Sequence, residues 1–134
     1  MLDHHRALIY TMVIVSGAQA ELRDTELSLI GDIVEDLPVF RDFDRARLAP
    51  LLNDCAELIN RENGLDETLE AIKALLPSRL RETAYAIACD LVAADGEATQ
   101  EELQIVALLR RRLGLDRLIA AAIERGARAR FQTL

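Results

Sequence analysis

A tight turn between two helices is predicted most clearly by Leu91-Val92-Ala93-Ala94-Asp95-Gly96-Glu97-Ala98-Thr99-Gln100-Glu101-Glu102-Leu103. Asp95 and Gly96 follow an apolar helical run, and glycine tolerates the left-handed backbone that such an exit needs. Thr99 and Glu102 have the spacing of a capping box, in which each side chain accepts a hydrogen bond from the backbone N–H of the other residue. The stretch therefore predicts one helix that ends near Asp95 and a second helix that Thr99 opens.

The rest of the chain predicts the same class of structure. Apolar residues recur at helical spacing, as Leu27, Ile30 and Val34 do before Pro38 stops the pattern. Aromatic residues make up only 4% and tryptophan is absent, so the core is expected to consist of Leu, Ile, Val and Ala. No linker or low-complexity stretch divides the sequence, which predicts a single all-α domain over residues 1–134. We expect a compact bundle of about seven helices, covering approximately residues 3–18, 24–37, 44–62, 66–76, 78–94, 99–114 and 116–128.

The apolar run of residues 7–15 imitates a secretion signal. It follows His4, His5 and Arg6, and it precedes Ala18-Gln19-Ala20, which resembles a signal-peptidase site. The run is interrupted by a tyrosine and a threonine, and it is much shorter than the roughly 20 residues that a membrane span needs. A buried core helix in a cytoplasmic protein is therefore the better interpretation.

Charge is distributed unevenly along the chain. The whole sequence carries a net charge of −7, but residues 1–107 carry −12 and residues 108–134 carry +5. The acidic body is expected to repel nucleic acid and oxyanions. The basic end is the candidate surface for an acidic protein partner or an anionic membrane, and its arginines are either a solvated helix face or a binding patch. The candidate residues are Arg110, Arg111, Arg112, Arg117, Arg125 and Arg128.

Two interpretations of the carboxylates near the 91–103 turn stay open. In the first, they only cap the turn and complement the positive end of the helix dipole. In the second, Asp95, Glu97 and Glu102 bind a hard divalent cation such as Ca²⁺, Mg²⁺ or Mn²⁺. Asp90 lies close by in an apolar helix, where its charge needs a partner, either the cation or an arginine such as Arg79 or Arg81. An EF-hand is excluded, because its first ligand positions would fall on apolar side chains.

No other group of residues predicts catalysis. Cys55 and Cys89 are far apart in apolar patterns, so we expect two buried free thiols rather than a disulfide or a metal pair. His4 and His5 are expected to be solvated, since adjacent helical positions do not face one site. A CxxC pair, a GxGxxG loop and a Walker loop are all absent from the sequence, so an enzyme that reduces an oxyanion is not expected.

An internal echo appears at an offset of 76 residues. Ala18, Glu21, Glu26 and Leu27 match Ala94, Glu97, Glu102 and Leu103, and further apolar positions match beyond them. In each half an apolar helix, a short loop and an amphipathic helix with an acidic start follow one another. This pattern predicts two helical hairpins related by a pseudo-two-fold axis.

The segment from Ala93 to Glu97, followed by Glu102 and Leu103 on an all-helical chain, resembles the TerB-like family of tellurite-resistance proteins. Residues 9–16 and 80–86 resemble its alphaproteobacterial branch, so that the resemblance spans nearly the whole chain. It implies a compact bundle of about seven helices with a pseudo-repeat. It also implies a role in tellurite and other chemical-stress resistance.

The resemblance further implies a partner set and a metal site. The partners would be other proteins of a stress-response complex, with peripheral contact to the inner membrane, and a homodimer is compatible with the sequence. The cation site falls on Asp95, Glu97 and Glu102. The first half of the family pattern often carries a second Asp-Gly turn, where this sequence has Gln19 and Ala20. A symmetric pair of metal sites is therefore not expected.

Overall fold

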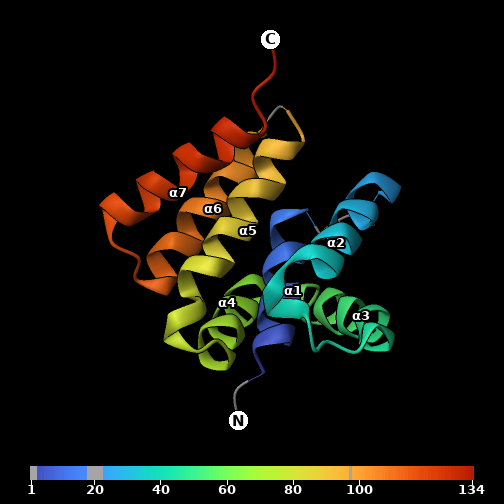
Figure 1. Ribbon diagram of the computed structural model, residues 1–134. Helices are drawn as coiled ribbons and strands as arrows, with labels where there is room; N and C mark the ends of the chain where they lie inside the picture. Colours follow the sequence, from blue (N-terminus) through green and yellow to red (C-terminus); the bar gives the residue numbers. More distant parts are fainter. Residues whose placement is uncertain (1–2, 18–22, 97) are drawn as a thin grey trace.

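A computed structural model describes residues 3–17, 23–96 and 98–134. In this part of the chain the structure contains seven α-helices, three short 3-10 helices and no strand, which confirms the all-α prediction (Figure 1). The helices are α1 (His4–Val15), α2 (Asp24–Asp36), α3 (Leu48–Ile59), α4 (Gly64–Leu75), α5 (Arg81–Ala94), α6 (Gln100–Leu113) and α7 (Arg117–Arg130), and the 3-10 helices are η1 (Pro38–Phe40), η2 (Arg45–Arg47) and η3 (Ser78–Leu80).

The apolar N-terminal run forms the centre of the core, as predicted. It folds as α1, and all of its residues from Ala7 to Val15 are buried. The Asp3 carboxylate caps the helix by accepting a hydrogen bond from the Arg6 N–H at 3.2 Å. The Thr11 hydroxyl, fully buried, donates to the Ala7 carbonyl at 2.8 Å, so the polar atom is satisfied inside the helix. α1 packs against α3, α4, α5 and α6.

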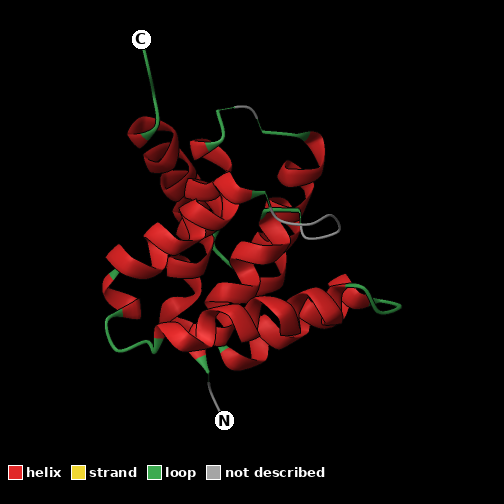
Figure 2. Ribbon diagram, turned by 90° about the vertical axis from the view of Figure 1, so that its right-hand side faces the viewer, coloured by secondary structure: helices red, strands yellow, loops and turns green. Residues whose placement is uncertain are grey.

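The second half follows the local sequence signals closely. Thr99 and Glu102 form the predicted capping box at the start of α6, and Gly114 ends that helix in the left-handed conformation with φ of 66°. Asp116 caps α7 by accepting from the N–H groups of Leu118 and Ile119 at 3.1 and 3.2 Å. α5 packs against both α6 and α7, and the C-terminal segment projects from this end of the molecule (Figures 1 and 2).

Boundaries of the third, fourth and fifth helices differ from the prediction. The third helix begins at Leu48 rather than near Asp44, and it ends at Ile59. The fourth helix starts at Gly64 rather than near residue 66, and Asn63 is its N-cap residue. The fifth helix begins at Arg81 because the preceding three residues form a 3-10 turn.

None of the helices that the structure describes is long and apolar enough to cross a membrane.

Candidate functional site

The predicted cation ligands lie at the junction of α5 and α6. Asp95 is the C-cap residue of α5 and is exposed. Glu102 is half-buried, and its Oε1 accepts a hydrogen bond from the Thr99 N–H at 2.9 Å. Glu97 lies outside the described residues. The capping interpretation therefore describes what Glu102 does, whereas no hydrogen bond among the described residues involves the Asp95 side chain.

Asp95 and Glu102 share a cavity of about 270 Å³ with carboxylates from α2. We call it the acidic cavity. It holds four carboxylates and one guanidinium, that of Arg23, which donates to Glu26 Oε1 at 2.9 Å. The hydrogen bond to Glu26, with the negative charges of Asp95 and Glu102 nearby, raises the pKa of Arg23. The lining residues are Val15, Ser16, Arg23, Thr25, Glu26, Ser28, Leu29, Asp32, Leu91, Ala94, Asp95 and Glu102.

Asp90 does not belong to the acidic cavity. Its carboxylate forms an ion pair with Arg130 at the end of α7. The suggestion that Arg79 or Arg81 neutralises it is wrong, because Arg81 points to α6, where it donates to the Leu113 carbonyl at 3.4 Å. The charge of Asp90 is thus compensated by a residue 40 positions away in the sequence.

The six candidate arginines of the basic end lie in different environments. Arg112 is held by Asp66 and by Glu70 of α4, the latter at 3.2 Å. Arg110 is half-buried and Arg128 is exposed, and both line a large groove. Three further arginines are exposed outside that groove, namely Arg111, Arg117 and Arg125. Apart from Arg112, none of the six candidate arginines forms an ion pair with a described residue.

The groove has a volume of about 860 Å³ and lies between α5, α6, α7 and the C-terminal segment. We call it the α5–α7 groove. Small side chains make it wide, and the apolar side chains of Leu103 and Phe131 on it are 48% and 41% exposed. It is lined by Tyr85, Cys89, Val92, Ala93, Ala94, Gly96, Ala98, Leu103, Val106, Ala107, Arg110, Glu124, Ala127, Arg128, Phe131, Gln132 and Thr133.

A partly buried polar pair lies among the lining residues of the groove. The Tyr85 hydroxyl donates to Glu124 Oε2 at 2.5 Å, so the hydroxyl is satisfied. Burial and this hydrogen bond raise the pKa of Tyr85. Burial also raises the pKa of the neighbouring Cys89 thiol to about 12, and that of Cys55 likewise to about 12. Both cysteines are free and buried, as predicted. With these raised pKa values the two thiols stay protonated near neutral pH, whereas a cysteine must be a thiolate to act as a nucleophile.

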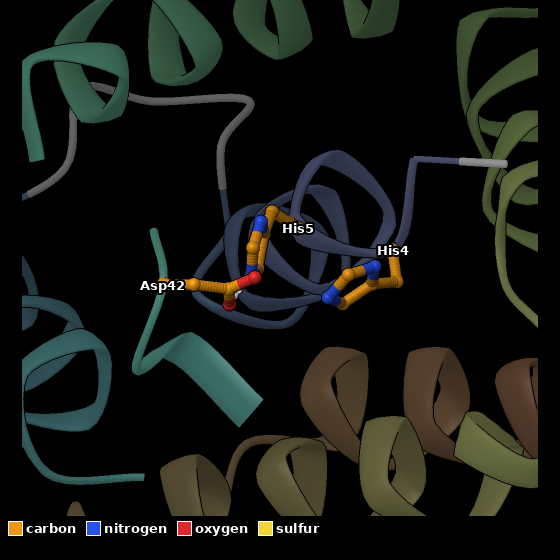
Figure 3. Close-up of side chains that lie close together, drawn as sticks. All are labelled: His4, His5 and Asp42. Carbon is orange, nitrogen blue, oxygen red and sulfur yellow. Dashed lines mark ion pairs between the residues drawn. The ribbon is translucent and has the colours of Figure 1, made fainter. Parts of the chain in front are cut away.

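One cluster of side chains was not predicted from the sequence. His5 is buried, with a residue exposure of 7%, so the prediction that it is solvated is wrong. One ligand atom from each of His4, His5 and Asp42 lies within 4.8 Å of the others (Figure 3). Among the described residues this is the one group of three or more metal-ligating side chains at that spacing, and the carboxylates of the acidic cavity do not form another. Two histidines at the first two positions of a helix were the available signal.

Comparison with protein-family models, with curated proteins and with solved structures finds no match to this chain. The TerB-like resemblance therefore stays a prediction.

Proposed function

We propose that this chain is a non-catalytic binding module of the TerB-like type, which acts in tellurite and chemical-stress resistance by binding an acidic amphipathic helix of a partner protein. The α5–α7 groove is the observation that carries the proposal. It has a volume of about 860 Å³, and its lining combines exposed apolar side chains with two arginines that form no ion pair with a described residue.

The apolar lining of the groove accounts for the hydrophobic half of the interaction. Leu103 and Phe131 expose apolar surface beside the small side chains of Ala94 and Ala107. An amphipathic helix buries such a surface by placing apolar residues at i, i+3, i+4 and i+7 along a groove. Each fully buried leucine of the partner would contribute about 1.5–3 kcal/mol before the cost of association is subtracted.

The positive charge of the groove accounts for the preference for an acidic partner helix. Arg110 comes from α6 and Arg128 from α7, and both guanidinium groups are without an ion pair among the described residues. By contrast, Arg112 and Arg130 of the same region are already paired with carboxylates. Carboxylates on a partner helix would form charge-assisted hydrogen bonds with the two unpaired groups.

The direct test is a titration of isotopically labelled protein with a synthetic acidic amphipathic peptide, followed by NMR. We expect saturable shifts in amide signals of the groove, and a loss of affinity of at least about tenfold in the variant with both Arg110→Glu and Arg128→Glu. The matched control reverses two exposed arginines outside the groove, Arg111→Glu and Arg117→Glu. Binding that is absent, or that falls equally in both variants, contradicts the proposal.

Two further experiments distinguish peptide binding from membrane binding and test the role in stress resistance. Vesicles containing anionic lipid should bind weakly, and to a similar degree in both variants. Host cells that lack the chain should regain tellurite resistance with the Arg111 and Arg117 variant but not with the Arg110 and Arg128 variant. Tighter binding to vesicles than to the peptide, lost only in the groove variant, would make the groove a lipid site.

The acidic cavity supports a second candidate, a divalent cation bound with the help of Asp95. The supporting observation is its charge, since four carboxylates face a single guanidinium. Oxygen ligands of this kind suit Ca²⁺, Mg²⁺ or Mn²⁺. The ligands that the resemblance implies are Asp95, Glu97 and Glu102, to which the cavity adds Glu26 and Asp32.

Thermal unfolding with each cation in turn tests the second candidate. A cation held at about 100 times its Kd adds roughly 2.7 kcal/mol, or about 10 °C in Tm for a domain of this size. We expect that rise in the wild type and not in Asp95→Asn, while Glu57→Gln, an exposed carboxylate on α3, keeps it. Equal Tm values with and without every cation in the wild type would show that the carboxylates only cap the turn.

A further inference from the structure

His5, at the start of α1, contacts the segment that follows α2. His5 Nε2 lies 3.0 Å from the Val39 carbonyl oxygen and 3.5 Å from Asp42 Oδ1. The His4 ring stands beside it, with the two ring centroids 4.0 Å apart (Figure 3). Two imidazoles and a carboxylate therefore converge from two segments that are more than 30 positions apart in the sequence.

Packing holds the central member of the cluster in place. The His5 ring stacks on Phe40 with 5.6 Å between centroids and meets the edge of Phe43 at 5.0 Å. Both phenylalanines are buried. A ligand fixed in this way loses little rotamer freedom when a metal binds, while His4 is half-buried and Asp42 is exposed, so both are free to adjust.

The charges around the cluster leave Asp42 available. The guanidinium groups of Arg6 and Arg47 are both paired with Asp3, and that of Arg6 also with Asp54, so neither forms an ion pair with Asp42. Among the described residues, the sole basic side chain at ion-pair distance from the Asp42 carboxylate is that of His5, at 3.5 Å. No arginine of the described chain forms an ion pair with Asp42.

We propose that His4, His5 and Asp42 form a binding site for a divalent transition-metal ion, Zn²⁺ being the best fit. Two imidazole nitrogens and one carboxylate oxygen are the ligand types that Zn²⁺ takes, at about 2.0–2.2 Å in a tetrahedral arrangement. Neighbouring ligand atoms are then roughly 3.3 Å apart, close to the 3.5 Å between His5 Nε2 and Asp42 Oδ1. The three ligand atoms lie within 4.8 Å of one another, so a small movement of the His4 and Asp42 side chains would bring all three to the distances of a Zn²⁺ site.

Metal binding at Nε2 of His5 requires a defined tautomer. The lone pair must be on Nε2, so the ring proton moves to Nδ1, and the hydrogen bond from Nε2 to the Val39 carbonyl is given up. The carbonyl, still close to the ion, or a water molecule takes the fourth position. The bound ion would connect the first turn of α1 to residues 39–42.

The test uses protein without a polyhistidine tag and the metal alone. Calorimetric titration with Zn²⁺ should give one site per chain, and Co²⁺ should show the visible bands of tetrahedral coordination. His4→Gln and Asp42→Asn each change one solvent-accessible ligand, and each should lower the Zn²⁺ affinity at least about tenfold and remove the tetrahedral Co²⁺ bands. His5 is left intact because it is packed in the core.

Two control variants test whether the loss of Zn²⁺ affinity is specific to this cluster. Asp36→Asn changes an exposed carboxylate at the end of α2, and Asp95→Asn changes the acidic cavity; both should keep the wild-type Zn²⁺ affinity. NMR of the imidazole nitrogens should show both rings shifting with one equivalent of Zn²⁺. A wild type without saturable Zn²⁺ binding, or equal affinity in His4→Gln, Asp42→Asn and the wild type, overturns the proposal.

Discussion

Replacing Gly64 with alanine is expected to lower the free energy of unfolding by at least about 3 kcal/mol. A Cβ atom at this position would lie 2.1 Å from the Ile59 carbonyl oxygen and 2.5 Å from that of Leu58. Both oxygens belong to the backbone at the end of α3, which cannot move aside as a flexible side chain would. The α3–α4 connection must therefore open before the methyl group fits.

The geometry of this connection explains why the approach is so close. Only four residues separate the two helices, and Asn63 takes the left-handed conformation with φ of 61° to turn the chain back. The Gly64 N–H then donates to the Arg61 carbonyl at 2.9 Å, and the Gly64 carbonyl accepts from the Thr68 hydroxyl at 2.7 Å. A shift of Gly64 disturbs both hydrogen bonds, so the loss exceeds a simple packing defect.

Gly31→Ala is the matched control. Gly31 lies inside α2, and a Cβ atom there would meet no heavy atom within 4 Å. Alanine in that helix is expected to stabilise the protein by about 0.5–1 kcal/mol. Urea unfolding followed by circular dichroism measures both variants, and a Gly64→Ala protein as stable as the wild type would show that the turn is looser than the structure has it.

The fold was predictable from sequence where the signals are local. The capping box of Thr99 and Glu102 and the cap at Asp116 depend on side chains within three residues of the backbone groups that they satisfy. The stop at Gly114 depends on the left-handed backbone of that glycine, whose N–H bonds back to the last turn of α6. The third helix begins later than predicted, although Pro50 gives a local signal for its start. Pro50 lies in the first turn of α3, where no N–H donor is required, and this position implies a start close to Leu48.

The candidate sites were less predictable because they depend on long-range pairing. Periodicity places Asp90 and Arg112 on helices, but it does not show that Arg130 and Asp66 face them from 40 and 46 positions away. The burial of His5 depends on residues 38–43 folding over the start of α1, where Phe40 and Phe43 pack against its ring. The α5–α7 groove also requires three helices to be in place before any of it exists.

The internal repeat stays a prediction, with one feature in its favour. Glu26 and Glu102 occupy matching positions in the 76-residue offset. In each case Oε1 accepts from the N–H of the residue three positions earlier, Arg23 at 3.1 Å and Thr99 at 2.9 Å. Both glutamates also line the acidic cavity, so the two halves meet there through equivalent helix starts.

Replacing Leu8 with alanine is expected to cost about 2–5 kcal/mol of the free energy of unfolding. Leu8 is fully buried in α1, the helix that packs against α3, α4, α5 and α6. Four surrounding helices leave little freedom for the neighbours to move into the cavity, so we expect the upper part of that range. Since a domain of this size is stable by only about 5–15 kcal/mol, the variant should unfold at a much lower urea concentration.

Leu118→Ala provides the contrast, because Leu118 is a leucine of α7 that is 80% exposed. Its removal should change the free energy of unfolding by no more than about 0.5 kcal/mol. Urea unfolding of the two variants beside the wild type measures the difference. Similar small effects at both leucines would contradict the burial of α1 and would reopen the interpretation of residues 7–15 as a secretion signal, whereas a large effect at Leu8 alone shows that this apolar run stabilises the folded domain.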